Sequence, residues 1–234
     1  MPDLTFPVPA GELPGYLAVP DATPAPGVVV LHEVFGLNDD MRRITDRFAA
    51  EGYLALAPDL YGWGVTARCL VSAFRAIYKR EGRQYDDMKG ARDFLAADER
   101  CSGKVGVIGF CMGGGFAIAA APMGFFDAAA PNYGEVPKDA DTVLTGSCPV
   151  VASYGGRDRM MKGRPERLEK ALVANDVPHD LKVYPDAGHS FWSHHDTGIS
   201  KVLDKIVRTN GFREEESEDA WKRVLGFFGE HLAA

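Results

Sequence analysis

The residues best suited to chemistry lie in segment 104–115, which reads KVGVIGFCMGGG. A short apolar strand, Val105–Gly109, leads into the pentapeptide GFCMG and then into a helix of small residues. This is the strand–turn–helix context of a nucleophile elbow, G-x-S-x-G, with cysteine in the place of serine. The turn is so tight that the positions beside the nucleophile have no room for a Cβ atom, which explains Gly109 and Gly113. We therefore predict that Cys111 is a nucleophile above the carboxyl edge of a sheet.

A cysteine nucleophile needs a base and an acid that orients the base. In enzymes with this elbow, the acid and then the histidine follow the nucleophile along the chain, each in a loop after a late strand. Asp158 follows strand Val150–Gly155, and His189 follows strand Leu181–Tyr184. The imidazole would take the thiol proton, and the carboxylate would fix its tautomer. This order predicts a Cys111–His189–Asp158 triad.

An acyl-transfer site also needs donors for the anion that forms at the reacting carbonyl. The first is expected from the backbone N–H of Met112, at the start of the helix after the elbow. The second is expected from Val34, in the loop after the predicted strand Gly27–His32. These two amides are our candidates for an oxyanion hole.

Each of these residues also has a purely structural interpretation. A lone cysteine is usually a small buried apolar residue, Asp158 suits an Asx turn, and His189 could cap a loop. Adjacent His194 and His195 suggest a metal pair, but adjacent side chains point apart and no third ligand is near in the sequence. No G-x-G-x-x-G pattern is found, so we expect neither a metal nor a cofactor.

Composition excludes several classes of function. The chain has 234 residues and a net charge of −7 without a basic stripe, which argues against nucleic acid as a partner. No signal peptide or apolar membrane span is evident. The cysteines are scattered, as is typical of a reducing cytosol, although two disulfides remain an open alternative; they are Cys69, Cys101, Cys111 and Cys148. We expect a cytoplasmic protein that acts on a small molecule, with no membrane partner.

Short apolar segments alternate with amphipathic ones along the chain. We expect strands over Gly15–Val19, Gly27–His32, Tyr53–Ala57, Val105–Gly109, Ala128–Asn132, Val150–Gly155 and Leu181–Tyr184. We expect helices over Asp39–Glu51, Cys69–Arg80, Tyr85–Ala97, Gly114–Ala121, Pro165–Ala174 and Ser217–Leu232. Apolar strands interleaved with helices predict an α/β fold, with a mostly parallel sheet covered on both faces. We predict a single domain over 1–234, with 197–212 as a helical insertion near the site.

Five motifs carry a resemblance to a known family, and they occur in the same order. They are HEVFGLN (32–38), PDLY (58–61), GFCMGG (109–114), GRD (156–158) and AGHSF (187–191). Together they resemble the dienelactone hydrolases, or carboxymethylenebutenolidases, over about residues 15 to 232. The resemblance implies an α/β-hydrolase fold without a large cap domain. It also implies a cytosolic enzyme that opens lactone rings in aromatic degradation. Such enzymes are usually monomers, and a dimer is the alternative oligomeric state.

The resemblance also implies roles for residues outside the triad. The glutamate of the first motif, Glu33, would hydrogen-bond the resting thiol and help to form the thiolate when substrate binds. The family holds its substrate's carboxylate with two arginines, for which Arg68 is one candidate, whereas Ser193 stands where the other would be. The candidate substrate-binding residues are therefore Phe35, Arg68, Tyr133, Trp192 and Ser193.

These observations favour a hydrolase that opens a small lactone or ester through a thioester acyl-enzyme. A carboxylesterase or thioesterase of broad specificity on the same triad is the second enzymatic interpretation, and the serine at position 193 favours it. A third interpretation is a redox-sensing or ligand-binding protein without turnover. Glu33, Asp158 and His189 argue against that interpretation, because a sensor does not need a proton relay.

Overall fold

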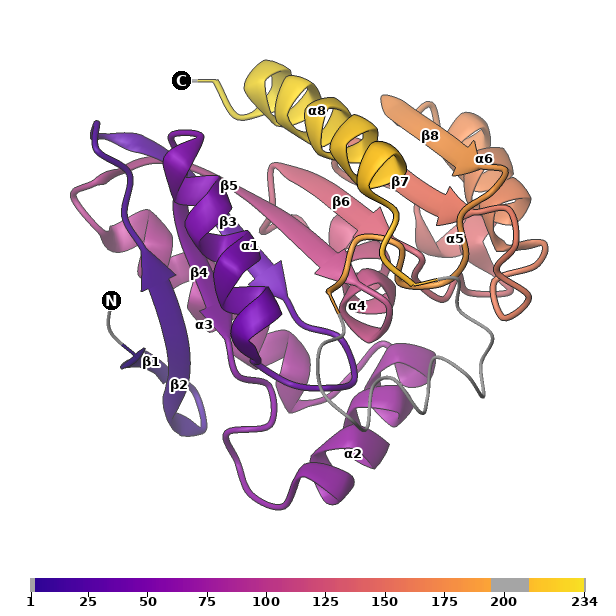
Figure 1. The fold of residues 1–234 in the computed structure, drawn as a ribbon. Coiled ribbons are helices and arrows are strands. Elements are labelled where there is room, and N and C mark those ends of the chain that lie inside the picture. The colour runs from indigo at the N-terminus through magenta and orange to yellow at the C-terminus, as the bar shows by residue number, and fades with distance from the viewer. Residues whose placement is uncertain (1–2, 195–210, 234) are drawn as a thin grey trace.

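A central sheet of eight strands organises the computed structural model, which describes residues 3–194 and 211–233. Helices cover both faces of this sheet (Figure 1). The strands are β1 (Asp3–Val8), β2 (Gly11–Ala18), β3 (Ala25–Leu31), β4 (Leu54–Pro58), β5 (Cys101–Phe110), β6 (Ala128–Asn132), β7 (Val150–Gly155) and β8 (His179–Tyr184). Their spatial order is β1-β2-β4-β3-β5-β6-β7-β8. The β1–β2 and β2–β4 pairs are antiparallel and the other pairs are parallel, which confirms the predicted α/β class.

The helices follow the strands in the predicted order, except for a short helix over Ala140–Val143 that the sequence analysis does not predict. They are α1 (Asp39–Ala50), α2 (Thr66–Lys79), α3 (Arg83–Ala97), α4 (Met112–Ala120), α5 (Ala140–Val143), α6 (Arg164–Ala174) and α8 (Glu214–His231), with a 3-10 turn, η1, over Ala121–Met123. Helices α1 and α8 pack on one face of the sheet, and α3 and α4 pack on the other (Figure 1). Asn38 caps α1, because its side chain accepts the N–H of Met41 at 3.0 Å.

Three differences from the predicted elements have local causes. Strand β1 is absent from the prediction and β2 begins earlier than expected; each contains a proline, Pro7 or Pro14, which removes a backbone donor and weakens the strand pattern. Helix α2 begins at Thr66 rather than Cys69. Its first turn has no side-chain cap at Val65, so the sequence carries no start signal there.

Other expectations concern the cysteines, the membrane and the insertion. All four cysteines are free thiols, so neither disulfide of the open alternative forms. Among the described helices, none combines the length and apolar character that crossing a bilayer requires. The predicted insertion over 197–212 lies outside the described residues except for Gly211 and Phe212. The ring of Phe212 packs on that of His194, with centroids 3.7 Å apart.

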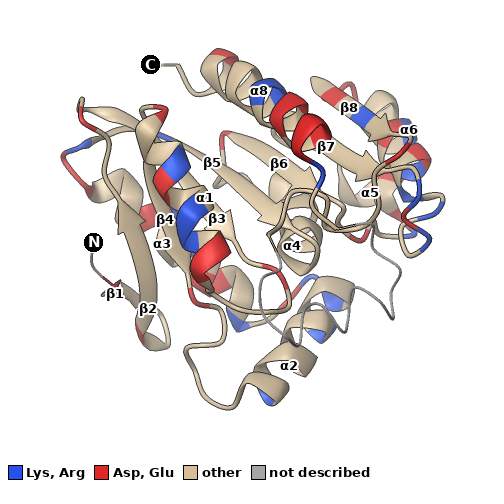
Figure 2. Cartoon of the chain, in the orientation of Figure 1, with Lys and Arg blue, Asp and Glu red and all other residues tan. Residues whose placement is uncertain are grey.

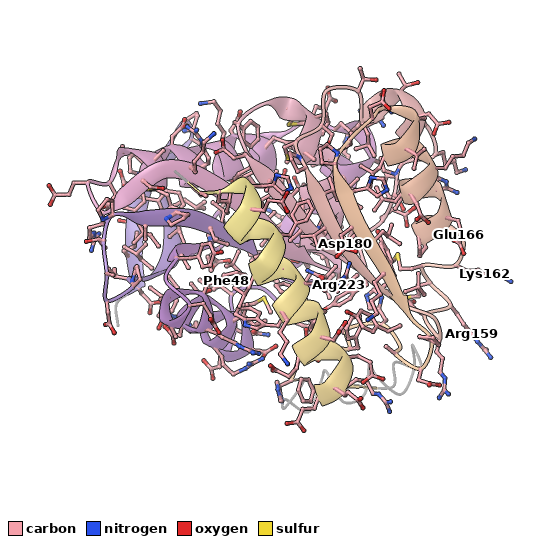
Figure 3. All side chains as sticks on the ribbon, turned by 90° about the horizontal axis from the view of Figure 1, so that it is seen from above. Phe48, Arg159, Lys162, Glu166, Asp180 and Arg223 are labelled. Carbon is pink, nitrogen blue, oxygen red and sulfur yellow. The ribbon has the colours of Figure 1, made fainter. Side chains whose placement is uncertain are left out.

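An aromatic cluster joins α1 and α8 to the sheet. Phe48 is fully buried, and its ring lies 4.6 Å from Trp221, 5.8 Å from Tyr53 and 6.3 Å from Phe228. Figure 3 shows α8 across the sheet, with Phe48 on one side and Arg223 and Asp180 on the other. The cluster fixes α8 over β6 and β7, and the loops that follow these strands lie at the candidate site.

Charged side chains anchor the same two helices. Acidic and basic residues are interspersed along the outer faces of α1 and α8 (Figure 2). Arg47 on α1 forms two hydrogen bonds to Glu218 on α8, at 2.7 and 2.6 Å. Arg223 on α8 forms an ion pair with Asp180 on β8 at 2.8 Å and donates to the hydroxyl of Ser153 on β7 at 3.1 Å. These contacts tie the C-terminal helix to α1 and to strands β7 and β8.

We expect Phe48→Ala to lower the free energy of unfolding by about 3–5 kcal/mol, because it empties a closed aromatic site. Urea unfolding followed by circular dichroism measures the change. Phe74→Ala on α2 is the matched control, since Phe74 is 42% exposed, and it should change stability by less than about 0.5 kcal/mol. Equal losses in both variants would show that the cluster is not a special source of stability.

Candidate active site

The turn between β5 and α4 holds Cys111 in a strained conformation. Cys111 has φ 51° and ψ −108°, in a region that side chains with a Cβ rarely occupy. A Cβ on Gly109 would lie 2.0 Å from the carbonyl oxygen of Gly113, and one on Gly113 would lie 2.3 Å from that of Leu31. The turn therefore requires glycine at both positions, two residues before and two residues after Cys111, as the elbow motif predicts.

The loops after β7 and β8 meet at the same edge of the sheet. They approach so closely that a Cβ on Gly155 would lie 2.4 Å from the carbonyl oxygen of Gly188. Asp158 and His189 are both buried, and Nδ1 of His189 is 2.6 Å from Oδ2 of Asp158. The other carboxylate oxygen accepts the N–H groups of Met160 and Met161, at 2.9 and 3.3 Å. The carboxylate is thus fixed before it orients the imidazole.

The second nitrogen of His189 is the one available for proton transfer. Nε2 is buried and makes no hydrogen bond of standard geometry within the described residues. Burial alone would lower the pKa of His189, but the negative charge of Cys111 and the hydrogen-bonded carboxylate of Asp158 outweigh it and raise the pKa to about 10. Catalytic hydrogen bonds often tighten only when substrate binds. The pKa of His189 therefore depends on the charge of Cys111.

The two predicted oxyanion donors come from neighbouring loops. Strands β3 and β5 are parallel neighbours with Leu31 opposite Gly109, so the loops that follow them emerge side by side. Met112 is the first residue of α4, where backbone N–H groups have no partner within the helix. Val34 lies two residues beyond His32 in the loop after β3. A carbonyl held at Cys111 would meet positive ends of backbone dipoles at this edge.

A buried chain of hydroxyl groups connects Glu33 to the other side of the site. The hydroxyl of Ser193 donates to Oε1 of Glu33 at 3.0 Å, and it lies 3.2 Å from the hydroxyl of Tyr133. Burial raises the pKa of Tyr133, and the charge of Glu33 raises it further. The side chain at the position of the family arginine is therefore engaged with Glu33.

Asp40 is a site residue that the sequence analysis missed. It lies in the first turn of α1, is largely buried, and accepts the N–H of His194 at 3.1 Å. Burial raises the pKa of Asp40, although hydrogen bonding to Arg43 opposes that shift. Asp40 fixes the segment that follows His189. In the sequence, an aspartate in the first turn of a helix is explained by its favourable interaction with the helix dipole. Nothing in the sequence therefore marked Asp40 as part of a site.

The remaining predicted substrate-binding residues come from three different segments of the chain. Phe35 is half-buried beside Val34, whereas Arg68 is exposed in the first turn of α2. Trp192 is only 4% exposed, and its ring packs on Phe110 at 5.3 Å and on Trp221 at 6.0 Å. Trp192 thus packs between Phe110 and Trp221 of α8, and its contact with substrate stays a prediction.

We expect His189 to titrate near pH 10 in the wild type and at lower pH in Cys111→Ala, because the thiolate that stabilises the imidazolium is removed. NMR titration of the imidazole carbon-bound protons measures both pKa values. Because folding raises this pKa above its ordinary value of 6.5, the associated stability is present below about pH 6.5 and is lost as the pH rises through 10. Cys148→Ala, at a remote thiol, is the control; an unchanged His189 pKa in Cys111→Ala would exclude the coupling.

Comparison with known proteins supports the resemblance seen in the motifs. A family model described as the dienelactone hydrolase family matches residues 13–232. A protein of Saccharolobus solfataricus, provisionally named a carboxymethylenebutenolidase, is 28% identical over 92% of this chain and 93% of its own length. A protein of Yersinia pestis with the same provisional name is 28% identical over 98% of this chain and 88% of its own length.

Solved structures agree with this assignment. A provisionally named dienelactone hydrolase from Klebsiella pneumoniae has a TM-score of 0.78 and 25% identity, and the match covers 98% of both chains. A dienelactone hydrolase-like promiscuous phosphotriesterase from metagenomic libraries shares the fold, with a TM-score of 0.77, 24% identity and coverage of 99% and 98%. With the family model matching nearly its whole length, the chain belongs to the dienelactone hydrolase family of carboxylic ester hydrolases.

Proposed function

We propose that this lactone or ester hydrolase uses Cys111 as its nucleophile, with His189 as its base and Asp158 as the group that orients the base. One observation carries the proposal: the strained Cys111 follows β5 at the same sheet edge as the buried His189 and Asp158. In that pair, Nδ1 of His189 lies 2.6 Å from Oδ2 of Asp158. The raised pKa of His189, caused largely by Cys111, supports contact between the two parts. Such a pair serves acyl transfer.

In the acylation step, Sγ of Cys111 attacks the substrate carbonyl carbon, and Nε2 of His189 holds the thiol proton. The N–H groups of Met112 and Val34 stabilise the negative charge on the carbonyl oxygen. The C–O bond to the leaving alkoxide then breaks, and His189 gives its proton to that oxygen. The product is a thioester; in a lactone, the alcohol formed remains attached to the acyl group.

In the deacylation step, a water molecule attacks the thioester carbon while His189 accepts one of its protons. The same two amides stabilise the second tetrahedral anion. The C–S bond breaks, the proton returns to sulfur, and a carboxylic acid leaves. Because thiolate is a good leaving group, the first anion readily reverts to substrate, so activated esters and strained lactones are better substrates than amides.

The substrate class that fits the site is a small ester or lactone without a required carboxylate. Ser193 replaces a cationic clamp with a neutral hydroxyl, and that hydroxyl already binds Glu33. An ionised group loses hydration on entering a buried site and needs a charged partner to compensate. The proposed role of Glu33 follows the family resemblance: it assists formation of the thiolate–imidazolium pair. The hydroxyl of Ser193 fixes its carboxylate, and Tyr133 in turn contacts Ser193.

A redox-sensing role without turnover remains the alternative from a different class. Cys111 is half-buried and at the carboxyl edge, where an oxidant has access. The buried Asp158–His189 pair argues against this role, because a fixed tautomer and an oriented proton acceptor serve proton transfer rather than oxidation. In the hydrolase the thiol is regenerated in every catalytic cycle, whereas in the sensor it is oxidised and no substrate is turned over.

We expect Cys111→Ala and His189→Ala each to lower kcat/KM for p-nitrophenyl acetate by at least about 10³-fold, because each removes a member of the proposed triad. Steady-state release of nitrophenol measures this loss, and electrospray mass spectrometry of quenched wild-type enzyme should detect an acyl adduct on Cys111. Cys148→Ala and His179→Ala are matched controls for the loss of a thiol and of an imidazole. Turnover that survives in both triad variants would reject the mechanism.

We expect a carboxylate on the acyl chain to bring no advantage. The ratio of kcat/KM for mono-p-nitrophenyl succinate to that for p-nitrophenyl butyrate should be one or less, since the neutral hydroxyl of Ser193 cannot replace a bidentate arginine. The cis- and trans-dienelactones test the same point with the family's own substrate. A preference of tenfold or more for the anionic ester, or efficient opening of either dienelactone by a Cys111-dependent route, would contradict the proposed substrate class.

A further inference from the structure

The loop that carries Val34 is held by buried side chains outside the predicted triad. His32 is fully buried at the end of β3, and its ring stands against the ring of Tyr61 with centroids 4.8 Å apart. Nδ1 of His32 is 2.6 Å from the carbonyl oxygen of Glu33. Nε2 of the same ring receives the backbone N–H of Leu60 at 3.1 Å. One imidazole thus joins the loop after β3 to the loop after β4.

These two contacts determine the protonation state of the ring. A carbonyl oxygen can only accept a hydrogen bond, so Nδ1 of His32 must carry a proton. A backbone N–H can only donate, so Nε2 must present its lone pair to Leu60. His32 is therefore neutral with its proton on Nδ1. Burial lowers the pKa of His32 in spite of the nearby Glu33 and Asp59 carboxylates, which is consistent with the neutral form.

The carbonyl that His32 holds belongs to the peptide group that carries the Val34 N–H. The C=O of Glu33 and the N–H of Val34 lie in one plane and point in opposite directions. Fixing the oxygen on the inner side therefore fixes the direction of the N–H on the other side. The N–H of Gly36 also donates to this oxygen at 3.2 Å, so the carbonyl has two donors. A carbonyl that accepts hydrogen bonds makes its own amide a stronger donor.

Tyr61 holds the next peptide group of the same loop. Its hydroxyl donates to the carbonyl oxygen of Val34 at 3.1 Å. A Cβ on Gly36 would lie 3.2 Å from the Tyr61 ring, so the loop is packed directly on it. Val34 is thus fixed through the peptide before it by His32 and through the peptide after it by Tyr61.

We infer that His32 and Tyr61 are positioning residues that orient the Val34 amide toward the carbonyl oxygen of the substrate. The inference rests on the proposed function, because Val34 serves as an oxyanion donor only if Cys111 performs acyl transfer. Both side chains are buried, and we assign neither of them a direct contact with substrate. Their effect passes through two backbone peptides, and it is specific to steps that build negative charge on a carbonyl oxygen.

Kinetics on the ester test this inference. Removing an oxyanion donor outright costs about 10²–10³ in kcat, so we expect a smaller loss, about tenfold or more, in His32→Leu, with KM within about twofold. His32→Asn retains a donor near the position of Nδ1 and should recover most of the lost kcat. Tyr61→Phe removes one hydroxyl, keeps the ring, and should lower kcat about threefold to tenfold. It also provides the test if His32→Leu does not fold.

Alkylation of Cys111 by iodoacetamide separates positioning from a general effect on the site. This displacement at a saturated carbon forms a C–S bond and releases iodide, so it creates no oxyanion. We expect the alkylation rates of His32→Leu and Tyr61→Phe to stay within about twofold of wild type. His179→Leu is the matched control for kcat, because His179 also contacts a backbone carbonyl, that of Val177, but lies on β8. A parallel fall in alkylation and kcat would overturn the inference.

The tautomer of His32 gives a readout that does not depend on turnover. In wild-type protein at pH 7, long-range ¹H–¹⁵N NMR spectra should show a proton on Nδ1 and a bare Nε2. A proton on Nε2, or a charged ring, would overturn the inference directly. Wild-type enzyme that shows no Cys111-dependent turnover while His32 has the expected tautomer would contradict the proposed function. The hydrogen bonds by which His32 holds the loop would still be supported.

Discussion

The site depends on the contact between the start of α4 and the end of β3. The backbone at Gly113 lies so close to the carbonyl of Leu31 that no side chain fits between them. This approach forces Cys111 into a positive φ, and it brings the loop after β3 beside the N-terminus of α4. The positions of Cys111 and of the two amides proposed to bind the oxyanion therefore both follow from one close packing of two backbones.

The acid–base part of the site is assembled separately, on the last two strands. Close packing of the β7 and β8 loops at Gly155 brings Asp158 and His189 together. Helix α8 holds these strands through Arg223, while α1 holds the segment after His189 through Asp40. The position of the imidazole is thus determined by packing on both halves of the sheet.

The sequence predicted the parts of the fold and site that depend on local patterns. The elbow glycines, the order of Cys111, Asp158 and His189, and the interleaved strands and helices all have short-range signals, and the fold class is confirmed. The contact of Ser193 with Glu33 could not be predicted, because it joins residues 160 positions apart through the path of a loop. The inward turn of Trp192 depends on the docking of α8, for which the sequence has no local signal.

The division of the site between early and late strands has a consequence for biosynthesis. A ribosome delivers β3, β5 and the elbow before the loops after β7 and β8, so the growing chain contains its thiol well before its base. The nascent protein thus lacks a proton acceptor for the thiol until the last part of the sheet has folded. Competence for hydrolysis arises only near the end of synthesis, and a chain that stops early carries an unassisted cysteine.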